Sequence, residues 1–392
     1  FSRIYTPAVF LIAVATALLP PLFFGGAWLD WVYRALVLLV IACPCALVIS
    51  TPVTIVSGLS AAARLGILIK GGVFLEMGRS LQWIALDKTG TLTEGRPRQT
   101  DFAPLRETAT GDVRALAASL AARSDHPVSH AVAVAAEADN IALYRVGELT
   151  ALPGRGVKGE IDGRTYHLGN HRLVEELGLC SKELEARLDA LEQQGRTVIV
   201  LLDDDGPLAL FAVADGVKQT SREAVSQLHA LGVKTLMLTG DNPHTATAIG
   251  AEVGIDVALG NLLPEDKLRE VKHRQAGGKR VGMVGDGIND APALARADIG
   301  FAMGAAGTDT AIETAGVALM DDDLRKLPSF IRLSRQTHRV LIQNVTLALG
   351  IKAVFLALTL AGEGTLWMAV FADMGASLLV VFNGLRLLRH HG

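Results

Sequence analysis

Two hydrophobic patterns divide this chain. Near both ends, mostly apolar residues continue for roughly the 20 positions that a bilayer-spanning helix needs. Four such runs are predicted to be membrane spans: Ala8–Phe24, Trp31–Ser57, Val345–Ala361 and Leu366–Leu388. Between the second and third runs, short apolar segments alternate with helical patterns and turn residues, which is typical of folded α/β domains. The pattern predicts two pairs of membrane helices on either side of a large polar insert.

The charges around these runs predict their orientation. The two short connecting loops, 25–30 and 362–365, contain no Lys or Arg. The opposite ends carry the basic residues Arg3, Arg64, Lys70, Arg79, Arg332, Arg335, Arg339, Arg386 and Arg389. Positive charge favours the cytoplasmic side of a membrane, so the insert is expected there. We expect an integral protein of a bacterial plasma membrane, with the lipid bilayer as a partner and the catalytic domains in the cytoplasm.

Composition narrows the class of protein. Half of the 392 residues are hydrophobic, 20% are charged, and the net charge is -3. The mean hydropathy is +0.35. No basic block indicates a nucleic-acid partner. The three cysteines are one close pair, Cys43 and Cys45, and the separate Cys180, which is no disulfide framework.

The second apolar run contains the sequence Cys43-Pro44-Cys45. Proline removes a backbone donor and opens a helix locally, so free carbonyl groups are expected beside the two sulfur atoms. Thiolates in this setting suit Zn²⁺, Cd²⁺, Pb²⁺ or Cu⁺. The alternative is two cysteines that only pack as small hydrophobic residues. We interpret the pair as ligands of a heavy-metal ion.

Two ionisable residues lie inside the last two runs, Lys352 in the third and Asp373 in the fourth. Neither is close to a helix end, and ionisable residues within membrane helices are usually functional. We expect Asp373 to bind the ion and Lys352 to balance its charge when the ion is absent. A structural ion pair is the alternative. A carboxylate ligand favours a divalent ion over Cu⁺.

Three apolar segments of the insert each lead into polar residues. The segments and their polar ends are Trp83–Leu86 before Asp87, Val233–Leu238 before Thr239-Gly240-Asp241, and Val281–Val284 before Gly285–Asp290. In a doubly wound parallel sheet, the carboxyl ends of the strands share one crevice. We therefore expect these polar residues to form one catalytic site.

The residues of this expected site suit phosphoryl transfer. A carboxylate such as Asp87 can accept a phosphoryl group and form an aspartyl-phosphate, and Lys88 adds positive charge beside it. Asp87 and Asp286 can hold Mg²⁺, which prefers oxygen ligands. Lys267 can offset the charge of the phosphoryl group. Thr239 can donate to that group, and Asn289 with Asp290 can orient the ligands of Mg²⁺.

The pattern changes after the first of these strands. Residues 94–98 are charged and contain proline, which is typical of a hinge. The region 98–210 has two predicted helical stretches, Asp112–Ala138 and Lys182–Gln194, and two predicted hairpins, turned at Asp162-Gly163 and Asp205-Gly206. This arrangement predicts an α+β unit with an antiparallel sheet.

Two short motifs in this unit are candidates for binding a nucleotide. They are His126-Pro127 and the glycines Gly154 and Gly156. An imidazole can stack on an adenine, and glycine admits a nucleotide close to the backbone. Each motif is weak alone, because His-Pro often starts a helix and Gly-x-Gly is common in turns. The sequence contains no P-loop motif.

The string Leu86–Thr93 resembles the phosphorylation signature of the P-type ATPases. Cys43-Pro44-Cys45 resembles the motif of their heavy-metal branch, and 371–377 with 383–386 resembles its zinc, cadmium and lead group. The resemblance covers essentially the whole chain. It implies that the catalytic residues are Asp87, Lys88, Thr89, Thr239, Gly240, Asp241 and Lys267. It implies that ATP is bound by His126, Pro127, Gly154, Gly156 and Asn170, and Mg²⁺ by Asp87, Thr89, Asp286, Asn289 and Asp290. The residues implied for the transported ion are Cys43, Cys45, Lys352 and Asp373.

The same resemblance implies a multidomain fold. Transmembrane helices are expected at 1–64 and 335–392. A haloacid dehalogenase-like phosphorylation domain, with a doubly wound parallel sheet, is expected at 65–97 and 211–334. The α+β ATP-binding domain is expected as an insert at 98–210.

The implied function is ATP-driven export of Zn²⁺, Cd²⁺ or Pb²⁺ through an aspartyl-phosphate, with ATP and Mg²⁺ as cofactors. The chain begins at Phe1, and no Thr-Gly-Glu loop precedes Asp87. We therefore expect a C-terminal fragment that lacks the N-terminal spans and the actuator domain of the family, and with them normal turnover. Three alternatives stay open: a Cu⁺ exporter, a membrane-anchored phosphatase, and a metal sensor that binds ions without turnover.

Overall fold

The computed structural model describes residues 2–106, 110–124, 126–286, 288–304, 309–360 and 363–389. It divides into two compact units, one formed by Phe1–Arg79 with Ser329–Gly392, and one formed by Ser80–Pro328. Ala361, the predicted end of the third span, lies outside the described residues.

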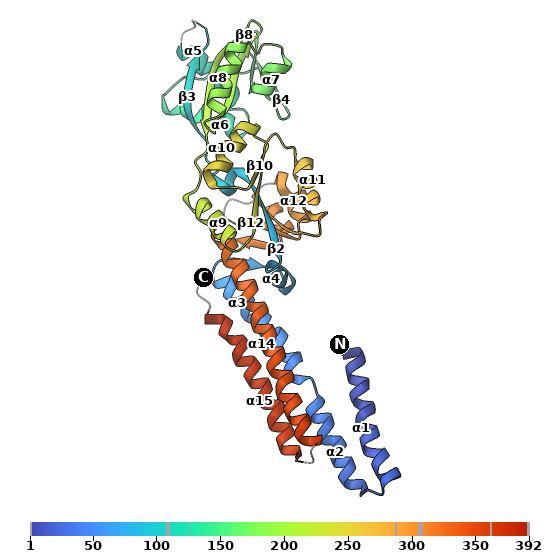
Figure 1. The fold of residues 1–392 in the computed structure, drawn as a ribbon. Coiled ribbons are helices and arrows are strands. Elements are labelled where there is room, and N and C mark those ends of the chain that lie inside the picture. Colours follow the sequence, from blue (N-terminus) through green and yellow to red (C-terminus); the bar gives the residue numbers. More distant parts are fainter. Residues whose placement is uncertain are drawn as a thin grey trace. The chain divides into compact units, whose positions relative to one another are not determined.

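The first unit is a bundle of long helices (Figure 1). Within it, α15 packs against α2 and α3, and α1 packs against α2. Its elements are α1 (Ser2–Phe24), α2 (Trp28–Ala42), α3 (Cys45–Arg64), β1 (Ile67–Ile69), α4 (Gly72–Gly78), most of α14 (Lys326–Leu360), α15 (Leu366–Leu385) and the short η3 (Arg386–Arg389).

Four candidate membrane spans occur in the described part of the chain, as the apolar runs predict. They are Tyr5–Phe23, Trp28–Arg64, Lys326–Thr359 and Leu366–Arg389. The second is not one continuous helix, because α2 ends at Ala42 and α3 begins at Cys45. Cys43 has an extended backbone with φ -60° and ψ 124°. Pro44 lacks a backbone N–H, so the helical hydrogen bonding is interrupted where the sequence predicts an opening.

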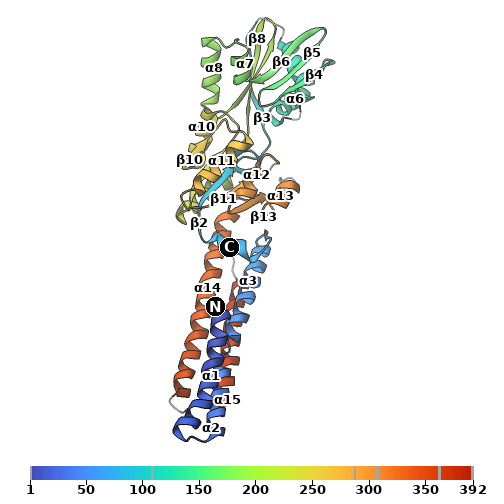
Figure 2. The ribbon, with the colours of Figure 1, turned by 90° about the vertical axis from the view of Figure 1, so that its right-hand side faces the viewer.

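The second unit contains two sheets, of which one is parallel (Figure 2). Its strands are ordered β13-β12-β11-β2-β9-β10, and every neighbouring pair is parallel. The strands are β2 (Leu81–Asp87), β9 (Lys234–Leu238), β10 (Val257–Leu259), β11 (Arg280–Gly285), β12 (Ile299–Met303) and β13 (Val317–Leu319). The associated helices are α9 (Gln219–Ala230), α10 (Pro243–Val253), α11 (Pro264–Gln275), η2 (Ile288–Asp290), α12 (Ala291–Arg296) and α13 (Asp309–Thr314).

The central strands of this sheet consist almost entirely of buried apolar residues. In β2, five consecutive residues from Trp83 to Asp87 are buried, and β11 is buried from Val281 to Gly285. Near-continuous apolar strands are expected where helices cover both faces of a parallel sheet. The predicted doubly wound sheet is confirmed.

An antiparallel sheet forms the other part of the second unit, ordered β3-β8-β7-β6-β5-β4. Its elements are β3 (Arg98–Pro104), α5 (Thr110–Ala121), α6 (Pro127–Ala138), β4 (Leu149–Leu152), β5 (Gly156–Ile161), β6 (Arg164–Asn170), α7 (His171–Glu176), α8 (Lys182–Glu192), β7 (Thr197–Asp203) and β8 (Gly206–Ala214). Both predicted hairpins are present, but the second turns at Asp204 and Asp205, one position before the predicted Asp205-Gly206 pair. At the first turn, Asp162 and Gly163 have φ of 50° and 78°, the conformation that an Asp-Gly pair favours.

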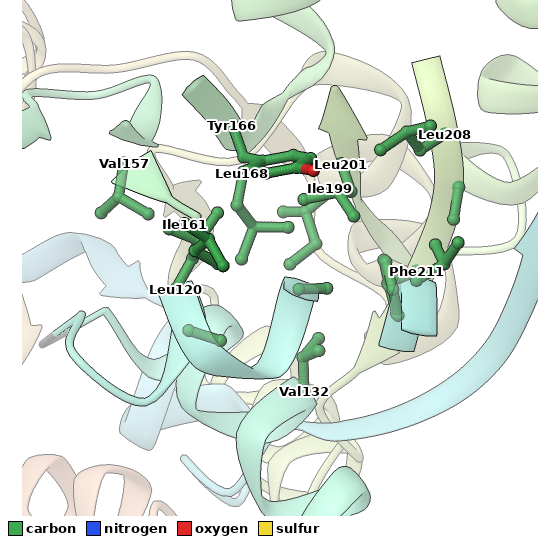
Figure 3. Close-up of a cluster of buried hydrophobic side chains, with 14 of the residues drawn as sticks. Leu120, Val132, Val157, Ile161, Tyr166, Leu168, Ile199, Leu201, Leu208 and Phe211 are labelled. Carbon is green, nitrogen blue, oxygen red and sulfur yellow. The ribbon is translucent and has the colours of Figure 1, made fainter. Parts of the chain in front are cut away.

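One apolar cluster joins this sheet to its helices (Figure 3). Leu120 of α5 and Val132 of α6 pack with inward-facing residues of β5 to β8. Phe211 is fully buried, and its ring centroid lies 5.2 Å from that of Phe102. This contact attaches β3, the first strand of the antiparallel sheet, to its centre.

The helical prediction at Asp112–Ala138 needs a correction, since the structure has two helices there. The first, α5, ends at Ala121, and α6 begins at Pro127. The side chain of His126 accepts from Val128 N, and proline occupies the first helical position. These are signals of a helix start, so the His-Pro pair separates two helices rather than lying inside one.

The packing predicts which core substitution damages the antiparallel sheet most. Phe211→Ala should lower its free energy of unfolding by about 3–5 kcal/mol, because the change removes a fully buried ring and leaves a cavity. Hydrogen exchange of the β7 and β8 amides in the detergent-solubilised chain measures this loss. Val134→Ala, at a position 48% exposed, serves as the control and should change little. Equal effects of the two substitutions would contradict the packing described here.

Candidate functional site

Asp87 lies at the carboxyl end of β2, the strand between β11 and β9. Its side chain is only 9% exposed. The following residues, Lys88–Leu92, form a tight loop in which Gly90 has φ 69°. A Cβ atom at Gly90 would lie 2.0 Å from Asp286 Oδ2. Glycine is therefore needed both for the backbone conformation and for the close approach of Asp286.

Lys267, near the start of α11, connects two carboxylates at this point. Its Nζ atom contacts Asp87 Oδ1 and lies 2.8 Å from Asp290 Oδ1. All three side chains are less than 10% exposed. A buried charge is tolerated when it is paired and hydrogen-bonded, and here one ammonium group serves two carboxylates.

Burial and neighbouring charge shift the pKa values of this cluster. Desolvation, followed by the charge of Asp290, raises the pKa of Asp87 to about 7, against the opposing effect of Lys267. The same two causes raise the pKa of Asp286 to about 6. Burial alone would lower the pKa of Lys267, but Asp87 and Asp290 raise it above its usual value. The site thus holds excess negative charge that one lysine does not balance.

Asp87, Asp286 and Asp290 form a group suited to a cation. One carboxylate oxygen from each lies within 4.8 Å of the others. Three carboxylates whose negative charge is only partly balanced by Lys267 form the donor set that a hard divalent ion prefers. The residues predicted to bind such an ion are therefore brought together, except that Asn289 lies exposed in η2 and Thr89 is half-buried in the loop.

A second ion pair completes this edge of the sheet. Lys88, directly after Asp87, contacts Asp241 Oδ2, which follows β9. Thr239 is buried, and its hydroxyl accepts from Asp241 N at 3.1 Å. Gly240 between them is exposed. The structure thus places all the predicted catalytic residues along the carboxyl ends of β2, β9 and β11 or on α11.

Two residues that support the loop were not predicted from the sequence. Lys218 Nζ donates to Gly90 O at 2.7 Å. Asp215 accepts from Thr93 Oγ1 at 2.5 Å and from two backbone N–H groups of the 94–98 hinge. Both residues follow β8, on the chain segment that returns from the antiparallel sheet. The signal available in the sequence was the position of the charged residues Asp215 and Lys218 shortly after the long apolar strand β8.

The predicted nucleotide residues fall into two groups. Asn170 Nδ2 donates to Gly154 O at 3.0 Å, and Asn170 Oδ1 accepts from Leu173 N to begin α7. Gly156 has φ 145°, and a Cβ atom there would lie 2.2 Å from Leu168 O. This glycine loop and Asn170 are therefore one structure. His126 and Pro127 stand apart, at the start of α6.

His126 lies within electrostatic reach of the phosphorylation residues. Desolvation is the main cause that lowers its pKa, the charge of Asp241 opposes this, and Lys88 adds to it. A nucleotide held at His126 would therefore be close to the pair that flanks Asp87.

A separate cluster lies in the helical unit. Lys352 Nζ, on α14, is 3.0 Å from Asp373 Oδ1 on α15 and 2.9 Å from Ile41 O, and it also contacts Cys43 O. The ammonium group therefore donates hydrogen bonds to the carbonyl oxygens freed by the break at Pro44 and pairs with the Asp373 carboxylate. The predicted association of Lys352 with Asp373 beside Cys43 is present.

The two cysteines of this cluster lie on either side of the helix break. The extended backbone at Cys43 and the turn at Pro44 bring their Cα atoms to 5.6 Å, and their sulfur atoms are in contact. The two sulfur atoms are therefore close enough to bind one ion together.

The fold and the Asp87 site define a class of protein. Residues 81–298 match the haloacid dehalogenase-like hydrolases, and the chain belongs to this family. More particularly, it is 49% identical to a probable cadmium-transporting ATPase of Staphylococcus aureus strain MRSA252, over 99% of this chain and 54% of that protein. It is 45% identical to the zinc/cadmium/lead-transporting P-type ATPase of Escherichia coli strain K12, over 99% of this chain and 52% of that one.

A solved structure of a heavy-metal P-type ATPase is also similar to this chain. The chain resembles the crystal structure of a zinc-transporting PIB-type ATPase in the E2.Pi state, with a TM-score of 0.79 and 44% identity. The match covers 99% of this chain and 63% of that one. These similarities confirm the predicted resemblance to heavy-metal P-type ATPases. The chain spans about half the length of the curated relatives it matches.

The raised pKa of Asp87 predicts how the ion-free site titrates. Because the shift is upward, the carboxyl is protonated below a pH of about 7 and becomes a carboxylate only above it. Difference infrared spectroscopy of the metal-free chain should show a buried protonated carboxyl that is lost between about pH 6 and 8. The part of the signal centred near pH 7 should be absent in Asp87→Asn, where only the Asp286 carboxyl with its pKa of about 6 remains, and the whole signal should be kept in Asp205→Asn, an exposed turn variant. Titration of Asp87 near its ordinary value of 3.8 would be the contrary result.

Proposed function

We propose that this chain carries the phosphorylation and ion-binding machinery of a P-type ATPase that exports Zn²⁺, Cd²⁺ or Pb²⁺. The observation that carries the proposal is the buried Asp87 carboxylate, held by Lys267 beside Asp286 and Asp290 at the edge of a parallel sheet. An aspartate in this position is arranged as an acceptor, since it is desolvated, close to cationic groups and reached through a glycine loop.

In the proposed reaction, an Asp87 oxygen attacks the terminal phosphorus of ATP. A new P–O bond forms to Asp87 as the bond to the bridging oxygen breaks, and ADP leaves with that electron pair. Lys267 moves from neutralising two carboxylates to neutralising the incoming phosphoryl group. Thr239 offers a hydroxyl to the same group. Lys88 keeps Asp241 in place at the mouth of the site.

The acidic group at Asp87, Asp286 and Asp290 fits Mg²⁺. Its oxygen donors and its excess negative charge suit this hard ion, and the contact between Gly90 and Asp286 keeps the loop close to it. Mg²⁺ bound there would supply charge neutralisation for the phosphate oxygens. The predicted partners Thr89 and Asn289 lie on the two flanking loops.

ATP is proposed to bind between 98–210 and the Asp87 site. The Gly154 loop, fixed by Asn170, is exposed and has open space around Gly154. The imidazole of His126 is available for adenine. The division into a phosphorylation domain (65–97 and 211–334), an ATP-binding domain (98–210) and membrane parts (1–64 and 335–392) belongs to this proposal.

The ion site is proposed at Cys43, Cys45 and Asp373 in their reduced and ionised forms. Lys352 holds Asp373 and two carbonyl groups, so it acts as a built-in counter-ion that a divalent ion must displace. Two thiolates and a carboxylate suit Zn²⁺, Cd²⁺ and Pb²⁺ better than Cu⁺. A Cu⁺ exporter is therefore the weaker alternative.

Transfer of phosphate from ATP tests the assignment of Asp87. With radiolabelled ATP, the chain should form an acid-stable phosphoenzyme, and Asp87→Asn should form none, because an amide cannot accept the phosphoryl group. Asp205→Asn, on an exposed hairpin turn, should be labelled like the unmodified chain. Label that persists in Asp87→Asn would refute the proposed acceptor.

Ion affinity tests the membrane cluster. In the reduced, detergent-solubilised chain, Asp373→Ala should weaken Zn²⁺ and Cd²⁺ binding by about tenfold or more, since an anionic ligand is lost. Cu⁺ binding should change little. Competition with a chromophoric chelator measures both affinities, and Asp30→Ala, outside the cluster, is the control. A chain that binds Cu⁺ tightly and is indifferent to Asp373→Ala would favour the copper alternative.

A further inference from the structure

A group of metal-ligating side chains lies on α7 and α8, in the antiparallel part of the second unit and separate from the residues discussed above. His171 is the first residue of α7, while Asp189 and Glu192 lie three positions apart on α8. Residues at this spacing share one face of a helix. One ligand atom from each of the three lies within 4.8 Å of the other two.

The burial of Glu192 makes this group unusual. Its side chain is only 4% exposed, and Glu192 Oε2 lies 3.6 Å from Nδ1 of the His171 ring. Burial raises the pKa of Glu192, while His171 and a hydrogen bond from Asn242 lower it. Two carboxylates therefore converge on one imidazole.

The other side of the His171 ring is also occupied. Nε2 lies 3.7 Å from Cys180 Sγ and 3.9 Å from Glu175 Oε1. A histidine that binds a metal through one nitrogen usually hydrogen-bonds through the other, which fixes the ring orientation. The contacts of Nε2 thus leave Nδ1 as the nitrogen directed toward Glu192.

The donor set indicates the kind of ion. One imidazole nitrogen and two carboxylate oxygens form a mixed set that suits borderline ions such as Zn²⁺, whereas Mg²⁺ is bound almost wholly by oxygen. Ligand atoms about 2 Å from a tetrahedral ion lie roughly 3.3 Å apart, so small side-chain rotations close the present spacing. Water would complete the coordination, as in other sites with three protein ligands.

We propose that His171, Asp189 and Glu192 form a second site for a divalent transition-metal ion, bound through His171 Nδ1 and both carboxylates. The site stands independently of Cys43, Cys45 and Asp373 and does not rest on the proposed transport function. An ion there would bridge α7 to α8. Since α7 begins directly after Asn170, it would also stabilise the helix that follows the glycine loop.

Zn²⁺ binding to the whole chain tests this proposal. The chain carries Cys43→Ser and Cys45→Ser to weaken the membrane cluster, is stripped with chelator, and is titrated calorimetrically in detergent. Zn²⁺ should bind with at least one equivalent that His171→Gln and Asp189→Asn each weaken by about tenfold or more. Glu183→Gln, an exposed change on the same helix, should retain it.

Hydrogen exchange tests the site in a chain that keeps all three ligands, so the result does not depend on whether a variant folds. In the chain with His171, Asp189 and Glu192 intact, Zn²⁺ should slow exchange of the α7 and α8 amides, because an ion bound only to the folded state stabilises it. Binding that is unchanged in His171→Gln would overturn the proposal. So would Zn²⁺ that leaves α7 and α8 exchange unaltered in the intact cluster.

Discussion

The contact of Lys267 with Asp87 and Asp290 is the interaction on which the catalytic unit depends. Three carboxylates meet within a few ångströms at the end of a desolvated sheet, and such charges are tolerated only with compensation. The Lys267 ammonium group compensates part of the negative charge. Burial and the neighbouring Asp290 outweigh it, so the pKa values of Asp87 and Asp286 are raised. The site is therefore suited to receive positive charge.

The helical unit uses a similar arrangement. Lys352 pairs with Asp373 and takes up carbonyl oxygens freed by the break at Pro44. In both clusters a lysine occupies a place that suits a cation, so carboxylates remain paired when no other ion is present. For each cluster, binding is an exchange of partners rather than the filling of an unpaired site. This gives one physical reason why occupancy of the clusters can be switched.

Much of the Asp87 site could be predicted because each of its residues directly follows an apolar strand or opens a helix. Parallel strands bring such positions together wherever the sheet is formed. The hairpin at Asp162-Gly163 was predictable for the same local reason, since two neighbouring residues determine the turn. The second hairpin was predictable too, but its turn residues are Asp204 and Asp205, one position before the predicted Asp205-Gly206 pair. The supports at Lys218 and Asp215 were not, because their partners lie more than a hundred residues away.

Other features depend on tertiary context that no local pattern carries. The contact between the sulfur atoms of Cys43 and Cys45 follows from the backbone at Pro44, while the sequence indicates only that two cysteines are close. His126-Pro127 is a pair that often starts a helix, but the Ala-rich pattern on both sides favoured one continuous helix there. The group at His171, Asp189 and Glu192 needs α7 to pack beside α8, so only half of it, the spacing on α8, is visible in the sequence.

The central proposal is that Asp87 accepts the phosphoryl group of ATP in a pump whose transported ion binds at Asp373. The most direct test measures phosphoenzyme formation from ATP by the reduced chain in lipid vesicles, with and without Zn²⁺ or Cd²⁺. Either ion should raise the amount of phosphoenzyme, and Asp373→Ala should abolish this stimulation while the fold is kept. Phosphorylation that is equal with and without ions, and indifferent to Asp373→Ala, would contradict this proposal.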